Sequence, residues 1–255
     1  MAGHSKWANT KFRKAAQDQK RGKLFTKLIR EITIATKQQG ADPNLNPRLR
    51  GAIDKALTAN LTKDAIERAI KRALGNEEKS LIEVGYEGYG PYGIAVMVDC
   101  LTDNHTRTVS NVRHLFSKHR GNLGVDGSVS YLFTKQGQIF LPEDLNLTEL
   151  QLNNIMEIAI NGGALDFDQQ AGGVLIVTDP KNLMDLKYLL EKSVPALGSR
   201  IENAEIVMAA NNYIKPDKRE AAMKINTFLE NLEDLDDVQV VHCNVDLSDL
   251  EINES

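Results

Sequence analysis

The chain has 255 residues, 42% of them hydrophobic, and a formal net charge of −4 at pH 7. This is enough apolar material for ordinary globular cores, yet no apolar run approaches the roughly 18 residues that a membrane span needs. Cys100 and Cys243 form no C-x-x-C pair, and the amino terminus lacks the apolar stretch of a signal peptide. We therefore expect a reduced, cytoplasmic protein with no membrane partner.

The charge is unevenly distributed along the chain. Residues 1–80 hold 18 Lys and Arg against 8 acidic residues, whereas residues 81–255 hold 13 against 27, so the two parts carry +10 and −14. The basic part should attract a polyanion and the acidic part should repel it. We expect nucleic acid as the partner of the basic part and a protein as the partner of the acidic part.

The first thirty residues carry nine Lys and Arg and one acidic residue, Asp18. We predict a helix over Lys20–Gln38. At roughly 100° per residue, its basic face spans about 80° of arc and carries Lys20, Lys23, Lys27 and Arg30. Apolar side chains face the opposite way, and they are Phe25, Leu28, Ile29, Ile32 and Ala35. Only Ile34 interrupts the basic face.

We predict that this stretch binds the phosphates of a nucleic acid. The predicted binding residues are His4, Lys6, Trp7, Lys11, Arg13, Lys14, Lys20, Arg21, Lys23, Lys27 and Arg30. Trp7 or Phe12 could stack on an unpaired base, or either could belong to a core. Phosphate contacts carry no sequence choice, so these residues do not separate DNA from RNA. The alternative is an ordinary solvated helix face.

Two further short helices follow. Gly40–Asn44 is a breaker cluster, after which Asn46 caps a helix with Pro47 in its first position. Its apolar face is Leu49, Ile53, Ala56 and Leu57. Thr62 caps the next helix and Gly75 ends it, and the predicted buried face is Ile66, Ala69, Ile70, Ala73 and Leu74. Residues 1–79 are thus predicted to form a basic helical domain.

Strands begin near residue 81. We predict strands over Leu81–Tyr89 and Ile94–Leu101, a helix over Thr106–His119 and a strand over Ser128–Phe133. The glycine-rich run between the first two strands is predicted to be a hairpin turn, because a phosphate-binding loop would be followed by a helix. Its tyrosines could bind a partner or lie half-buried on the sheet.

The middle of the chain shows a complete β-α-β-β-α-β order, typical of a ferredoxin-like fold. The predicted elements are Gln138–Leu141, Thr148–Asn161, Leu165–Asp168, Val174–Thr178, Leu183–Lys192 and Ile201–Ala209. A last helix and strand, Asp217–Leu232 and Val238–Val245, have no partners left there, so we expect them to complete the earlier strands.

The predicted fold is therefore α+β. It has an N-terminal helical bundle and two ferredoxin-like α/β sandwiches, the third domain being inserted in the second. The predicted domains are 1–79, 80–135 with 215–247, and 136–214, followed by an acidic tail at 248–255.

One group of side chains invites an enzymatic interpretation, namely Asp99, Cys100, Asp103, His105, His114 and His119. His114 and His119 lie about 140° apart around a helix, which prevents them from sharing a metal there. The chain has none of the common zinc-protease, phosphate-loop, nucleophile-elbow or paired-cysteine motifs. Asp103 and Asn104 are better explained as helix caps. We expect no catalytic residue, no metal and no cofactor.

Two stretches resemble the YebC family. The first is H-S-K-W-A-N followed by R-K-A-A-x-D-x-K-R-G-K-x-F-T-K-L-I-R-E-I at the amino terminus. The second runs from Cys100–Asn104 through Gly121–Gly124 to Gly127–Val129. The chain departs from the family pattern at Thr10, Phe12, Tyr92 and His105–Thr106.

The resemblance implies three domains with the last inserted in the second. Bacterial members of this family are labelled probable transcriptional regulators, and mitochondrial relatives are translational activators of a cytochrome oxidase subunit. We therefore expect a non-enzymatic, DNA-binding regulator of transcription, present as a monomer. The alternative implied by the family is a ribosome-associated translation factor that binds ribosomal RNA and relieves stalling. A protein-interaction scaffold is the third hypothesis.

Overall fold

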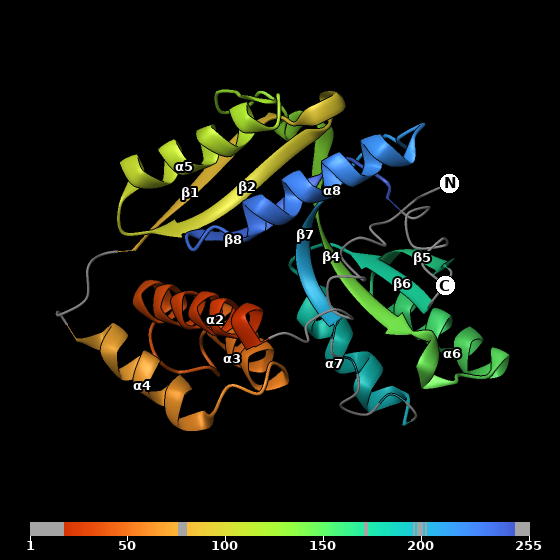
Figure 1. Ribbon diagram of the computed structural model, residues 1–255. Helices are drawn as coiled ribbons and strands as arrows, with labels where there is room; N and C mark the ends of the chain where they lie inside the picture. Colours follow the sequence, from red (N-terminus) through yellow and green to blue (C-terminus); the bar gives the residue numbers. More distant parts are fainter. Residues whose placement is uncertain are drawn as a thin grey trace. The chain divides into compact units, whose positions relative to one another are not determined.

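A computed structural model describes residues 18–75, 81–170, 173–195, 197, 201 and 203–247 (Figure 1). The chain divides into two compact units, one formed by Met1–Leu132 with Ala210–Ser255 and the other by Phe133–Ala209. The α+β class is confirmed, because the described helices accompany two four-stranded sheets. The division into three domains stays a prediction, and the predicted acidic tail at 248–255 lies outside the described residues. No helix in the described ranges is both long and apolar enough to cross a membrane.

A bundle of three helices opens the first unit. The helices are α2 (Asp18–Gln39), α3 (Pro47–Thr58) and α4 (Lys63–Leu74). Their shared core contains Ile32, Ala35, Leu49, Ala52, Ala56, Ile66 and Ala69. The predicted burial of Leu74 is wrong, because its side chain is 63% exposed, and Leu57 on the apolar face of α3 is 39% exposed. Each lies one residue, or about 100°, past a buried alanine that already fills the core position.

Asn46 fixes the connection between α2 and α3. Its carboxamide oxygen accepts the Leu49 amide at 2.9 Å, which is the predicted N-cap, with Pro47 in the first turn. Its amide nitrogen donates to the carbonyls of Ala35 and Gly40, both at 2.8 Å. The side chain is fully buried, so all its polar atoms are satisfied within the protein. Thr62 caps α4 in the same way, through the Ala65 amide.

The first sheet has the strand order β3-β1-β2-β8, and every neighbouring pair is antiparallel. Its strands are β1 (Ile82–Tyr89), β2 (Ala95–Thr102), β3 (Asn122–Leu123) and β8 (Val238–Cys243). A short 3-10 turn, η1 (Pro91–Gly93), joins β1 to β2 as the predicted hairpin. Strands β2 and β3 therefore lie on either side of β1 and run parallel to each other, as in a split β-α-β unit.

Two helices cover one face of this sheet, α5 (His105–Lys118) and α8 (Arg219–Glu233) (Figure 1). Phe116 and Phe228 meet edge to face between them, with ring centroids 5.1 Å apart. Both phenylalanines are fully buried against Val96, Val98 and other strand residues. The C-terminal helix and strand thus complete the sheet that begins at residue 82, as predicted.

The predicted strand Ser128–Phe133 is wrong. Ser130–Leu132 forms a 3-10 turn, η2, and the outer strand of this sheet is β3 instead. The cause is the Glu87 carboxylate, which accepts backbone N–H groups of Gly127, Val129 and Ser130 at 2.8–3.1 Å. These donors are turned toward one side chain and are not available to a neighbouring strand.

The second unit confirms the predicted β-α-β-β-α-β order. Its elements are β4 (Phe133–Pro142), η3 (Glu143–Leu145), α6 (Glu149–Asn161), β5 (Ala164–Gln170), β6 (Gly173–Thr178), α7 (Leu183–Ser193) and β7 (Asn203–Ala210). The strand order β5-β6-β4-β7 is that of a ferredoxin-like sheet. A capping box between Thr148 and Gln151 starts α6. The core of this unit includes Ile139, Ile155, Ile176 and Leu186.

Candidate nucleic-acid interface

The predicted binding residues fall into three groups in the structure. His4, Lys6, Trp7, Lys11, Arg13 and Lys14 lie outside the described residues, and Lys20 and Arg21 are placed only as positions on α2. Lys23, Lys27 and Arg30 are described with their side chains, on the face of α2 opposite the bundle core. The face is interrupted by Ile34, as predicted, and Ile34 is itself only 5% exposed.

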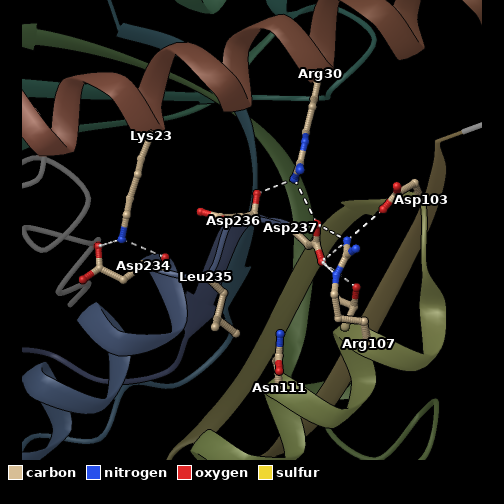
Figure 2. Close-up of a pocket in the computed structure, with 10 residues that line it drawn as sticks. Lys23, Arg30, Asp103, Arg107, Asn111, Asp234, Leu235, Asp236 and Asp237 are labelled. Carbon is tan, nitrogen blue, oxygen red and sulfur yellow. Dashed lines mark hydrogen bonds and ion pairs between the residues drawn. The ribbon is translucent and has the colours of Figure 1, made fainter. Parts of the chain in front are cut away.

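The three described cations bind oxygens of one short segment in the same unit, the acidic turn (residues 233–237). Lys23 Nζ donates to the Asp234 carbonyl at 3.1 Å and lies 3.4 Å from its carboxylate. Lys27 Nζ donates to the Glu233 carbonyl at 2.7 Å. Arg30 donates to the Asp236 carbonyl and to Asp237 Oδ1, the latter at 3.1 Å (Figure 2). Three predicted phosphate-binding groups thus already hold anionic or carbonyl oxygens.

The position of the acidic turn explains this attraction. It begins at Glu233, the last residue of α8, where the final carbonyls of the helix lack intrahelical partners and carry partial negative charge. Lysines are favourable at such an end because they donate to these carbonyls and oppose the helix dipole. Lys23 and Lys27 come from another helix, so two segments about 200 residues apart in sequence satisfy each other.

Asp237 is the centre of the contact. Its side chain is 7% exposed, and it accepts hydrogen bonds from Arg30, from Arg107 at 2.9–3.3 Å and from the Thr108 hydroxyl at 2.8 Å. Bonds to Asp237 and Asp103 raise the pKa of Arg107 above its ordinary value. The Asp237 carbonyl also accepts the Leu101 amide at 2.8 Å. Asp237, which precedes β8, therefore joins α2 and α5 through its buried carboxylate and β2 through its main-chain carbonyl.

A hollow of about 650 Å³ lies beside this contact (Figure 2). Its lining is Lys23, Arg30, Asp103, Arg107, Thr108, Asn111, Asp234, Leu235, Asp236 and Asp237. The three cations of the lining are each paired with a carboxylate of the same lining. Four carboxylates face these three cations, and every cation is already paired, so the hollow is better explained as a junction between elements than as a site for a charged ligand.

Sequence reasoning missed this pairing. It placed the basic stretch and the acidic turn in different parts of the chain and assigned each to an outside partner. The available signal was the opposite sign of the two parts, +10 and −14, because opposite charges in one chain also attract each other.

The side chains considered for catalysis are not assembled into a site. Cys100 is 2% exposed, and its pKa is raised to about 12, first by burial and then by Asp99 and Asp237, so it is a thiol at neutral pH. Asp99 pairs with His242 across the strands at 3.2 Å. Of the two predicted caps, Asn104 caps α5 through the Arg107 amide at 3.0 Å, whereas Asp103 is not the N-cap and pairs with the Arg107 side chain. In the described part of the chain, no cluster of three His, Cys, Asp or Glu side chains is arranged to hold a metal.

Two family models match nearly the whole chain. Residues 5–76 match the TACO1/YebC protein N-terminal domain, and residues 81–245 match the TACO1/YebC second and third domain.

Similar full-length proteins have the same extent. A probable transcriptional regulatory protein of Nitrosococcus oceani is 52% identical over 251 residues, covering 98% of this chain and 97% of the relative. One of the same name from Acinetobacter baylyi is 50% identical over 250 residues, with the same coverage. The crystal structure of a conserved hypothetical protein from Aquifex aeolicus is 45% identical, with a TM-score of 0.78, and covers 89% of this chain and 91% of its own.

Proposed function

The chain belongs to the TACO1/YebC family, and from this membership and its segregated charge we propose that it is a nucleic-acid-binding regulator of transcription. The observation that carries the proposal is the excess of eight positive charges over the first thirty residues, in a chain whose overall charge is −4. Such a segment binds the phosphate backbone by charge and releases its counterions.

The contacts of α2 are compatible with this proposal, although its cations are already bound within the protein. Lys23, Lys27 and Arg30 converge on a row of carbonyl and carboxylate oxygens in the acidic turn. Phosphate oxygens are stronger acceptors of the same kind, and a guanidinium can bind them through two N–H groups. In this proposal the acidic turn binds the α2 cations when no nucleic acid is present. A phosphate backbone must displace it, so a weakly binding nucleic acid is excluded.

A binding assay with a charge-reversed variant tests the proposal. Lys20, Lys23 and Lys27 are replaced by Glu, and affinity for a labelled DNA duplex and a labelled single-stranded RNA is measured by fluorescence anisotropy. The matched control reverses three exposed lysines of the second unit, Lys135, Lys181 and Lys192. We expect the α2 variant to lose binding and the control to keep it. Equal affinities of the two variants would contradict the role of α2.

A second experiment separates the transcriptional hypothesis from the ribosomal one. The native protein is sedimented from lysate through a sucrose gradient, with and without nuclease. Co-migration with ribosomes that the α2 variant loses would favour a translation factor. If the protein stays at the top of the gradient, a promoter competition assay follows, since a specific regulator should prefer its site over other DNA by roughly 4 to 10 kcal/mol.

The proposed function requires no catalysis. Cys100, the strongest nucleophile candidate, is buried and protonated. The hydroxyl that faces the hollow, Thr108, donates to Asp237 and touches the Thr102 hydroxyl at 2.8 Å, so it is committed to structure. We therefore propose that the protein acts by binding alone.

A further inference from the structure

Helix α5 differs in charge from the part of the chain that contains it. Of the α-helices in the described ranges, it alone has no Asp or Glu. The 22 residues between Asp103 and Asp126 hold no acidic side chain, four Lys and Arg, and three His. This run lies within residues 81–255, which carry a net −14. A basic, acid-free helix in an acidic region needs an explanation beyond average composition.

The outward side of α5 carries the unpaired cations. Val112 and Phe116 are fully buried in the core under the helix, which leaves the opposite side to solvent (Figure 1). Arg107 is tied to Asp103 and Asp237. Arg113, Lys118 and Arg120 are exposed, and among the described residues no hydrogen bond or ion pair joins their side chains to another group. Arg113 and Lys118 lie about 140° apart around the helix and flank its exposed side, and Arg120 follows the helix end; these three residues are the α5 basic face.

Arg120 occupies a backbone conformation that does not favour arginine. Its φ is +61°, in the left-handed region, and the Gly121 amide donates to the Phe116 carbonyl at 2.8 Å. With the Arg120 amide donating to Ser117, this is a Schellman turn, whose left-handed position is usually glycine. A side chain kept there at the expense of backbone strain indicates a use for the side chain itself.

Stabilisation of the helix end explains only part of the pattern. Lys118 and Arg120 stand at the C-terminus of α5, where positive charge opposes the helix dipole. Arg113 lies in the middle of the helix, where this effect has faded. His119 is bonded to Asn231 and its pKa is lowered by burial and by Lys118, so it adds no charge at neutral pH.

We propose that the α5 basic face is a second contact for the phosphodiester backbone of a nucleic acid, separate from the α2 residues. The inference rests on the proposed function and extends it to a surface that the sequence analysis did not assign. Its cations are free to bind phosphate, whereas Lys23, Lys27 and Arg30 hold the acidic turn. Exposed Ser117 on the same side adds a neutral donor for phosphate oxygens. This surface would recognise the charge of the phosphates and not the sequence of the bases.

The test is a neutralised variant, Arg113→Gln with Lys118→Gln and Arg120→Gly. The probes are a labelled single-stranded RNA and a labelled DNA duplex of about 20 nucleotides per strand, titrated at several salt concentrations. If all three residues bind phosphates, the slope of log affinity against log salt falls by about 2 on the RNA and by about 2.7 on the duplex. The preferred nucleic acid is the probe whose slope loss comes closer to the value expected for three phosphate contacts on that probe. The matched control replaces Lys135, Lys181 and Lys192 by Gln and should keep the wild-type slope.

Folding is checked by thermal unfolding, and Arg120→Gly should not lower Tm because it relieves the left-handed strain. If the triple variant misfolds, Arg113→Gln alone is measured instead. It should reduce the slope of log affinity against log salt by about 0.7 on RNA. A wild-type slope and affinity in these variants would overturn the α5 contact, while the α2 variant still decides the proposed function. Binding of neither probe by the wild-type protein would overturn both.

Discussion

Replacing Asp237 tests the claim that one buried carboxylate joins α2 and α5 beside the start of β8. Hydrogen bonds to a charged group contribute about 1.5 to 3 kcal/mol each when buried. Asp237 accepts from three side chains, but Arg30 and Arg107 are 22% and 45% exposed, so water recovers part of the loss. The low end for three donors is about 4.5 kcal/mol, and after the discount for the two exposed arginines we expect Asp237→Ala to lower the free energy of unfolding by roughly 3 to 4 kcal/mol. Asp237→Asn keeps the volume and one acceptor, and should cost roughly half as much.

The assay is urea denaturation followed by circular dichroism, together with hydrogen exchange. The Leu101 amide, which donates to the Asp237 carbonyl, reports the first unit directly. Asp185→Asn is the control, since this exposed carboxylate lies on α7 in the second unit. A double-mutant cycle with Arg107→Ala should give a coupling energy of about 1 to 2 kcal/mol. The reasoning is refuted if Asp237→Ala and Asp185→Asn unfold within about 0.5 kcal/mol of each other.

Three further changes have defined expectations. Asn46→Ala removes a helix cap and the donors to the buried Ala35 carbonyl and the partly buried Gly40 carbonyl, so urea denaturation should show a loss of about 3 kcal/mol; a loss below about 1 kcal/mol would contradict the capping role. Burial raises the pKa of Glu87, but the backbone N–H bonds lower it more, so its net pKa is below the ordinary value. Its stabilisation is therefore complete above the unfolded pKa of about 4.3 and is lost as pH falls through the folded pKa. Hydrogen exchange in residues 124–130 should accelerate in the wild type as pH falls through the folded pKa of Glu87, whereas Glu87→Gln should remove this pH dependence. Cys100, with its pKa raised to about 12 by burial, should resist iodoacetamide at pH 8 until urea is added, as read by mass spectrometry; rapid labelling of the folded protein would contradict its burial.

Local signals in the sequence predicted most of the fold. Caps at Asn46, Thr62 and Asn104 fixed where helices begin, because each side chain satisfies an amide that its own helix leaves free. Apolar periodicity found the remaining helices and most strands to within a few residues. The one wrong strand, Ser128–Phe133, has the residue pattern of a strand. Its backbone N–H groups bind the carboxylate of Glu87, about 40 residues earlier, and no local sequence pattern predicts so distant a contact.

The candidate site was harder to predict for a similar reason. The basic face of α2 follows from helical periodicity, but its contacts with residues 233–237 depend on the tertiary fold. The strain at Arg120 could not be predicted either, since no sequence pattern indicates that an arginine adopts a left-handed backbone conformation. Charge patterns predict what a surface attracts, and only the fold decides whether the protein itself supplies the attracted group.

The order in which the first sheet can be assembled follows from its connectivity. Strand β2 pairs with β8, about 140 residues later, so Val96 and Val98 remain at an open edge while the second unit is being synthesised. The second unit is contiguous and has all its strands before β8 emerges. The entropy of closing so long a loop grows only with the logarithm of its length, so the delay costs time more than stability. A chain truncated before residue 238 should therefore keep a folded second unit and expose an aggregation-prone edge at β2. This risk of aggregation lasts until β8 is synthesised and pairs with β2.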